Sequence, residues 1–227
     1  LKNYNLAIRL SENDDNLYVN RGLVYLDLGQ LKKAGEDFNL ALKINSGNSL
    51  ASLYLSNILY PDNISRIENL NQFIENRKVP EAYANRAYYR YLENDYPGAI
   101  ADYDSAIFLN NNDPELYLNR GMTKEKISEF NSAMKDYEVA NLLDPDNPKI
   151  YYQIGNVHFK LERFKVSINY YTKSISLDPE QSNVYYNRGL AYHNKNDHNK
   201  ACQDMKKAQS LGLEASIQFI NKHCENH

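Results

Sequence analysis

Hydrophobic residues recur three and four positions apart along much of the chain, which indicates helices that bury one face rather than alternating β-strands. Residues 50–60 and 64–76 show this spacing, and the turn Pro61-Asp62-Asn63 separates them. We therefore expect pairs of helices joined by short turns, in an all-α protein. No apolar run approaches the length of a membrane-spanning helix.

The chain also contains an internal repeat. The pattern Tyr-X-Asn-Arg-Gly occurs at residues 117–121 and 185–189, which lie 68 positions apart, and a related segment at 151–155 lies midway between them. The period is therefore 34 residues. Similar segments occur at 18–22 and 83–87. Self-similarity at a fixed period of this length is typical of a repeat architecture.

Small and aromatic residues keep the same phase as these segments. The small residues at three places of the repeat are Gly22, Ala87, Gly121, Gly155 and Gly189, then Ala34, Ala99, Ala133, Ser167 and Ala201, then Ala41, Ala106, Ala140, Ser174 and Ala208. Four positions after the second small residue comes an aromatic residue or Met, namely Phe38, Tyr103, Tyr137, Tyr171 or Met205. Small side chains at helical spacing let two helices approach closely, and large ones fill the space beside them.

This 34-residue pattern resembles the tetratricopeptide repeat (TPR) family over nearly the whole chain. The resemblance implies an α-solenoid, in which antiparallel helix pairs stack into a right-handed superhelix with a concave groove. Five matches in phase make the resemblance specific.

In this frame the chain divides into a leading half-repeat, six repeats and a cap, at residues 1–14, 15–48, 49–79, 80–113, 114–147, 148–181, 182–212 and 213–227. Residues 1–14 match the second helix of a truncated repeat, which suggests a piece of a longer chain. The second repeat is degenerate, because it has only 31 residues and carries Glu68, Gln72 and Glu75 at places that are small or aromatic elsewhere. We expect a helix pair with altered packing there, and a capping helix after residue 212.

Four repeats carry an Arg followed by an Asp sixteen positions later, and these pairs are Arg21 and Asp37, Arg86 and Asp102, Arg120 and Asp136, and Arg188 and Asp204. In the second and fifth repeats both charges are absent. An unpaired charge at a partly buried seam is costly, so we predict a charge-assisted contact between the two helices of one repeat. Pairing between neighbouring repeats is less consistent, because Arg86 would then face Asn71. Chance on solvated faces is the other alternative.

The resemblance also implies which side chains line the groove. Carried over place by place, the candidates for peptide binding are Asn20, Asn85, Tyr88, Asn119, Met122, Tyr152, Gln153, Asn156, Phe159, Tyr186, Asn187 and His193. An amide stands at the sixth place of five repeats and would form a ladder that donates to and accepts from an extended peptide backbone. Flanking aromatic residues supply rigid contact area. The alternative is compositional, because the chain is rich in Asn throughout.

One branch of the family resembles a carboxylate clamp that binds acidic C-terminal tails through Lys, Asn and Arg side chains. Asn156 and Asn187 match its two Asn places, but Tyr152 stands at the first Lys place. The sequence departs from the clamp there, so a mixed or uncharged peptide suits this groove better.

Cys202 and Cys224 are expected to face each other between the last repeat and the cap. A disulfide would imply a periplasmic or other extracytoplasmic location, whereas two buried thiols would be ordinary core in the cytoplasm. Two cysteines alone are weak evidence of a disulfide framework, so thiols are favoured and the compartment stays open. No metal site is expected from His198, Cys202, His223, Cys224 and His227, because their spacing matches no zinc motif.

Composition narrows the function further. Lys and Arg number 26 against 29 Asp and Glu, and the net charge of −3 gives no general attraction to nucleic acid or anionic lipid. No phosphate-binding loop, nucleophile elbow or two-His metalloprotease helix occurs, so neither catalytic residues nor a cofactor are expected.

The sequence thus predicts a non-catalytic scaffold that binds an extended peptide or a short helix of a protein partner in its concave groove. Neither nucleic-acid binding nor membrane insertion is expected. Two alternatives remain, namely a self-assembling module that forms a homo-oligomer, and a regulatory or accessory subunit of a larger enzyme or secretion complex.

Overall fold

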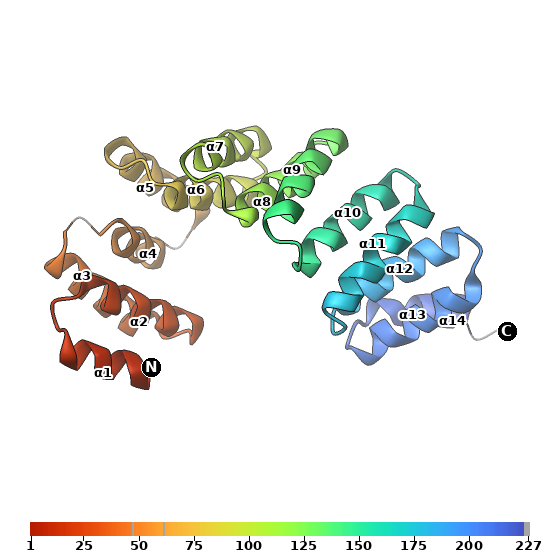
Figure 1. Ribbon diagram of the computed structural model, residues 1–227, viewed down its shortest axis with the longest axis horizontal. Coiled ribbons are helices and arrows are strands. Elements are labelled where there is room, and N and C mark those ends of the chain that lie inside the picture. Colours follow the sequence, from red (N-terminus) through yellow and green to blue (C-terminus); the bar gives the residue numbers. More distant parts are fainter. Residues whose placement is uncertain (47, 61, 225–227) are drawn as a thin grey trace. The chain divides into compact units, whose positions relative to one another are not determined.

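The computed structural model describes residues 1–46, 48–60 and 62–224, apart from the side chains of Ser49 and Ser56. Within these residues the chain forms α-helices joined by short turns and contains no β-strand (Figure 1). The all-α class expected from the hydrophobic spacing is confirmed. The chain divides into an N-terminal unit, Leu1–Asn111, and a C-terminal unit, Asn112–His227.

The N-terminal unit contains seven of the helices that the structure describes. They are α1 (Lys2–Leu10), α2 (Asp15–Asp27), α3 (Leu31–Ile44), α4 (Ser49–Leu59), α5 (Asn63–Asn76), α6 (Pro80–Leu92) and α7 (Tyr96–Leu109). Pro61, in the expected turn between α4 and α5, lies outside the described residues. The helices α2 and α3 pack extensively on each other, as do α6 and α7.

The C-terminal unit is built in the same way from its described part. Its helices are α8 (Pro114–Lys126), α9 (Phe130–Leu143), α10 (Pro148–Lys160), α11 (Phe164–Leu177), α12 (Ser182–Asn194), α13 (His198–Ser210) and α14 (Ala215–His223). Three extensive pairs form, α8 with α9, α10 with α11, and α12 with α13, and α14 covers α13 as the expected cap. The chain is therefore an α-solenoid of stacked helix pairs.

Local sequence signals explain where the first helix of each pair begins. Asp14, Asp113 and Asn147 each accept a hydrogen bond at 3.0–3.1 Å from the backbone N–H two residues later, which satisfies one of the free donors of a helix start. Proline occupies the first helical position of α6, α8 and α10. Its fixed φ suits that position, and its missing N–H is not needed there.

The turn between the two helices of a pair requires a left-handed residue. The φ angle is positive at Gly29, Asn94, Ser128, Glu162 and Asn196, with values of 58–69°. These residues occupy the same place in five repeats, yet only one is glycine. The turn therefore tolerates a side chain in a conformation that usually favours glycine.

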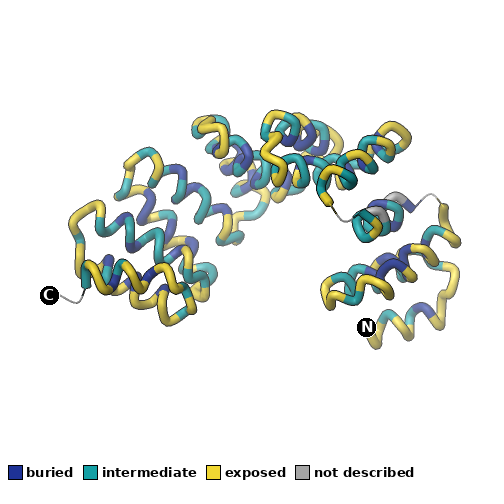
Figure 2. Tube along the Cα trace, turned by 180° about the vertical axis from the view of Figure 1, so that it is seen from behind, coloured by how far each residue is buried: buried dark blue, intermediate teal, exposed yellow. Residues whose placement is uncertain are grey.

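The helices of a pair cross closely at the glycines. A Cβ atom on Gly121 would lie 2.5 Å from Tyr137, and one on Gly155 would lie 2.6 Å from Tyr171. Gly22 is equally tight, with Phe38 at 2.7 Å. The facing aromatic side chains are fully buried, and buried residues concentrate where helices face one another within each unit (Figure 2). Glycine is needed there because the backbone of one helix touches the ring carried by the other.

The helices α4 and α5, which fall in the expected second repeat, depart from this pattern. The helix α4 packs mainly on α3, and α5 packs mainly on α6, so the contact between α4 and α5 is much smaller than in the other pairs. Leu53, Leu70, Ile74 and Ala82 still form a small buried cluster between α4, α5 and α6. The repeat thus keeps two helices but divides its packing between its two neighbours.

Candidate functional site

Most of the side chains expected to bind a peptide lie on three neighbouring helices of the C-terminal unit, since α10 contacts both α8 and α12 (Figure 1). These residues, which we call the C-terminal face, are Asn119, Met122, Tyr152, Gln153, Asn156, Phe159, Tyr186, Asn187 and His193. The remaining candidates belong to the N-terminal unit, with Asn20 on α2 and Asn85 and Tyr88 on α6.

Four polar residues of the C-terminal face form a hydrogen-bond network with Tyr171. The Asn187 side-chain amide donates to the Tyr152 hydroxyl and to Asn156 Oδ1, both at 3.0 Å. Tyr171 Oη donates to the same Asn156 oxygen at 2.8 Å, and the Asn156 amide donates to Gln153 Oε1 at 2.9 Å. The network therefore holds three of the candidate amides in fixed orientations.

Tyr171 supports this network from the buried seam between α10 and α11. Burial, with smaller contributions from Tyr152 and Glu125, raises the pKa of Tyr171 well above its ordinary value. The hydroxyl stays protonated at neutral pH and can donate to Asn156. Gln153 Nε2 and Asn187 Oδ1 have no hydrogen-bond partner among the described residues, so a donor and an acceptor remain for a ligand.

A buried carboxylate lies beside this network. Glu125 on α8 accepts a short hydrogen bond from the Tyr137 hydroxyl, and its other oxygen lies 2.8 Å from Lys160 Nζ on α10. Lys160 is half exposed and also lies 5.7 Å from the centre of the Phe130 ring. The ion pair thus joins α8 to α10 and leaves a cation partly accessible to a partner.

The larger side chains of the face are partly buried and support it. Met122 packs against the core formed by α8, α9 and α10, and the rings of Phe159 and Phe164 meet edge to face at 5.4 Å. Tyr186 is half-buried. These residues offer apolar contact area whose position is already fixed by packing.

The structure brings the four Arg–Asp pairs together within their repeats. Arg21 donates from Nε and Nη2 to the two oxygens of Asp37, at 2.8 and 2.7 Å. Arg86, Arg120 and Arg188 make the same forked contact, at 2.5–3.0 Å, to Asp102, Asp136 and Asp204. All four carboxylates are buried, and the hydrogen bond to Asp37 raises the pKa of Arg21 above its ordinary value.

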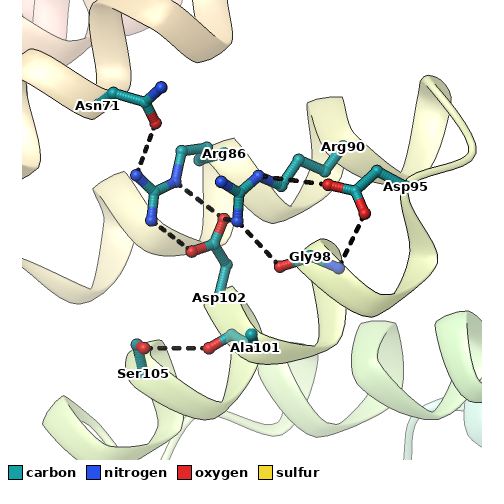
Figure 3. A network of polar contacts seen from close by, with 8 residues as sticks. All are labelled: Asn71, Arg86, Arg90, Asp95, Gly98, Ala101, Asp102 and Ser105. Atoms are coloured by element: carbon teal, nitrogen blue, oxygen red, sulfur yellow. Dashed lines mark hydrogen bonds and ion pairs between the residues drawn. The ribbon is translucent and has the colours of Figure 1, made fainter.

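The guanidinium groups of Arg21, Arg86 and Arg188 also reach the preceding helix. Nη1 of Arg21, Arg86 and Arg188 donates to Asn5, Asn71 and Thr172, respectively, at 2.7–3.0 Å. Figure 3 shows Arg86 between Asp102 and Asn71. Contacts within a repeat and between neighbouring repeats, treated as alternatives at the sequence level, therefore occur together.

The residue four positions after the Arg differs between repeats and changes the surroundings of the buried Asp. Arg90 lies 2.9 Å from Asp102 (Figure 3), and Lys124 lies 2.8 Å from Asp136. Each of these carboxylates therefore has two cations. Tyr25 and Tyr192 occupy the same place in the first and sixth repeats, and their rings lie 5.9 Å from Arg21 and Arg188. The residue four positions after the Arg is therefore a cation in two repeats and a tyrosine in two others.

The fifth repeat replaces the ion pair with apolar and aromatic packing. Ile154 is buried where other repeats carry the Arg, and the rings of Tyr170 and His158 stack at 5.4 Å. Burial, assisted by the charge of Arg163, lowers the pKa of His158 below its ordinary value. His158 Nδ1 is buried and has no hydrogen-bond partner among the described residues.

The preference for free thiols was wrong. Cys202 on α13 and Cys224, which follows α14, form a disulfide with their Cα atoms 5.7 Å apart. The antiparallel packing of the cap on α13 brings the two residues within bonding distance. The expected proximity of the two cysteines is confirmed, whereas their oxidation state could not be predicted because two cysteines give no framework pattern.

His193 is surrounded by aromatic rings from α13 and from the cap. Its ring lies 5.3 Å from His198, 5.1 Å from Phe219 and 4.7 Å from His223. Burial, followed by the charges of His223, His198 and Lys222, lowers the pKa of His193. The comparison of repeats could not reveal the whole cluster, because Phe219 and His223 lie in the cap, outside the repeats.

Within the described part of the chain, no three His, Cys, Asp or Glu side chains are arranged to hold a metal ion. His227 lies outside the described residues. None of the described helices has the length and apolar character needed to cross a membrane.

Comparison with family models identifies the repeat. A TPR repeat model matches residues 126–162 and 155–196, and a tetratricopeptide repeat model matches residues 15–48 and 182–211. The chain belongs to the tetratricopeptide repeat family. A sequence comparison with curated proteins finds no match to the chain.

Solved structures share the fold at low sequence identity. The chain is similar to a chain in the crystal structure of the APC/C hetero-tetramer Cut9–Hcn1, with a TM-score of 0.81 and 14% identity, and the match covers 98% of this chain but 45% of that one. It thus spans less than half the length of that relative. The structure of PilW, a type IV pilus biogenesis factor, matches with a TM-score of 0.78 and 16% identity. This match covers 91% of this chain and 98% of PilW. The structure of YrrB, a TPR protein with an unusual peptide-binding site, matches with a TM-score of 0.55 and 16% identity. This match covers 96% of this chain and 97% of YrrB.

The tetratricopeptide repeats support a protein-interaction scaffold, and proteins built from TPR repeats are generally non-catalytic.

Proposed function

We propose that the C-terminal face binds an extended segment or short helix of a protein partner, and that the chain has no catalytic activity of its own. The observation that carries this proposal is the amide network. It holds Gln153 and Asn187 in place while leaving one donor and one acceptor without partners among the described residues. A peptide backbone has both kinds of group, so it can complete the network.

The neighbouring side chains suit such a ligand. Tyr152, Tyr186 and Phe159 are half-buried, so their rings are positioned before binding and lose little conformational freedom on contact. Lys160 and Glu125 already neutralise each other, which favours a peptide of mixed or low charge over a strongly acidic one. The peptide-binding site named for YrrB adds support from a protein of the same fold.

Peptide selection tests the proposal. A random peptide library is screened against the immobilised chain, and the affinity of a selected peptide is then measured by calorimetry for the wild type and for Asn119→Ala plus Asn187→Ala. Loss of the Asn187 hydrogen bonds is expected to weaken binding by about tenfold or more, since buried polar contacts at an interface each contribute about 1 kcal/mol or more.

The matched control is Asn169→Ala, which removes an exposed Asn from α11. It is expected to bind like the wild type. If all three proteins have coinciding melting curves and bind the peptide with equal affinity, the C-terminal face is not the binding site and the proposal is contradicted.

Self-assembly is the second candidate, because α1 carries exposed apolar side chains. Leu6 and Leu10 stand one helical turn apart and are 59% and 81% exposed. Light scattering decides between the two: a mass that doubles with concentration and reverts in Leu6→Glu plus Leu10→Glu supports self-assembly, and a constant monomer mass contradicts it.

A further inference from the structure

We propose that the disulfide between Cys202 and Cys224 is a reducible lock that holds the capping helix α14 against the end of the C-terminal face. In the oxidised state α14 places Phe219 and His223 against His193; in the reduced state α14 leaves and this end of the face opens. The relevance to ligand binding rests on the proposed function, but the lock itself does not.

The contacts of α14 show why one bond controls this helix. It has nine residues, of which only Ser216 and Ile220 are buried. A helix this short is marginal unless its packing or a cross-link holds it. The disulfide closes a segment between positions 22 residues apart, and a cross-link over a loop of that length removes much of the conformational freedom that the released cap would gain.

The cap also completes the surroundings of a face residue. Phe219 meets the His193 ring edge to face at 5.1 Å, and the His223 ring lies 4.7 Å from it. His193 Nδ1 is buried without a hydrogen-bond partner among the described residues. Departure of α14 would therefore expose both an apolar end wall and an imidazole nitrogen on α12.

The bond is accessible to a reductant. A surface hollow of about 290 Å³ is lined by both cysteines together with His198, Lys206 and His223. The positive charge of Lys206 beside the disulfide attracts an incoming thiolate and stabilises the thiolate that leaves. A disulfide in a closed apolar core offers neither advantage.

The chemistry is an ordinary thiol–disulfide exchange. A dithiol such as dithiothreitol attacks one sulfur as its thiolate, the bond between the two Sγ atoms breaks, and a mixed disulfide forms. The second thiol of the reductant then displaces the remaining cysteine sulfur. The protein gains two electrons and two protons as two thiols, and the reductant becomes a cyclic disulfide.

Hydrogen exchange measured by mass spectrometry tests the lock without any ligand. The whole chain is compared in the oxidised state, after dithiothreitol treatment, and as the double variant Cys202→Ala plus Cys224→Ala. We expect exchange across residues 215–223 to become about tenfold faster or more in the last two samples, while residues 114–177 exchange as before. NMR titration adds a second readout: the pKa of His193 rises toward its ordinary value once burial and the charge of His223 are removed.

Controls separate the lock from other effects of the reagent. Dithiothreitol added to the double Ala variant is expected to change nothing. Unchanged exchange of residues 215–223 and an unchanged His193 pKa on reduction would overturn the proposal, because packing alone would then hold α14. Faster exchange throughout the C-terminal unit would also overturn it, since the bond would then stabilise the whole unit rather than the cap. Neither result depends on whether the face binds a peptide.

Discussion

Arg86 and Arg188 make the same three hydrogen bonds, two to an Asp and one to the preceding helix, but only Asp102 has a second cation beside it. This difference predicts unequal consequences of removing the two arginines. Arg188→Ala leaves Asp204 buried without a cation from any residue that the structure describes, and it is expected to cost about 3 kcal/mol of unfolding free energy. Arg86→Ala leaves Arg90 on Asp102 and is expected to cost clearly less.

Urea unfolding followed by circular dichroism measures both losses. Arg86→Ala plus Arg90→Ala serves as the control, because it removes both cations from Asp102 and should bring its loss to the level of Arg188→Ala. Equal losses for the two single variants would show that the second cation contributes nothing to the buried Asp.

His158 predicts a dependence of stability on pH. Its folded pKa lies below the ordinary value, so the unfolded chain takes up the proton more readily than the folded one. The contribution of the neutral imidazole is therefore fully present above about pH 6.5 and is lost as the pH falls through the folded pKa. Melting temperatures of the wild type and of His158→Phe, which keeps a ring to stack on Tyr170, measure this effect when the pH is lowered from about 7.5 to about 5.

The variant is expected to lose less stability than the wild type over that range. Parallel pH profiles for the two proteins would mean that His158 does not titrate differently on folding.

At the scale of helices, the crossing glycines carry the closest contacts. Gly121 faces a ring that is fully buried and fixed by the hydrogen bond from Tyr137 to Glu125, whereas the atom nearest to Gly189 is the flexible methyl end of Met205, at 3.1 Å. Gly121→Ala is therefore expected to destabilise the protein by about 1–3 kcal/mol through overpacking.

Gly189→Ala is the matched comparison. Here Met205 can move, but the Ala201 backbone oxygen and Asp204 Cβ, both 3.3 Å from the added Cβ, must shift by a few tenths of an ångström. Because alanine also favours the helix by about 1 kcal/mol, the change is expected to cost less than Gly121→Ala. Thermal melts of the two variants measure the difference, and a larger loss for Gly189→Ala would contradict the close crossing at Gly121.

The repeat explains how much of this architecture could be predicted. Small residues such as Gly121 and Ala133 recur in phase, so the helix pairs and their crossings follow from the period. The Arg–Asp spacing likewise recurs, and joint loss of both charges in the fifth repeat marks the two positions as a pair. The repeat boundaries at residues 15, 49, 80, 114, 148 and 182 stay a prediction.

Features that occur once could not be predicted in the same way. Glu125 and Lys160 lie 35 residues apart and have no counterpart pair in other repeats, and the disulfide lies where the repeat ends. The hydrogen bonds among Tyr152, Asn156 and Asn187 depend on side-chain orientations that a residue pattern does not contain. Periodicity predicts shared packing, whereas individual contacts require the three-dimensional arrangement.

At the scale of the whole chain, the proposed site is self-contained. The helices α8, α10 and α12 all belong to the C-terminal unit, and so does the cap that borders His193. Asn20, Asn85 and Tyr88 lie in the N-terminal unit, where their role in binding stays a prediction. We therefore expect the C-terminal unit to bind the peptide, and the N-terminal unit stays available for contacts with other partners.

Photo-crosslinking with a library-selected peptide that carries benzoylphenylalanine tests the central claim most directly. After irradiation, mass spectrometry maps the cross-linked residues of the chain. The account predicts cross-links to α8, α10 and α12, concentrated near Asn119, Gln153 and Asn187, and their loss on competition with the unlabelled peptide. Competed cross-links confined to α9, α11 or α13 would contradict the account, because the peptide would then bind the opposite helices of the repeats.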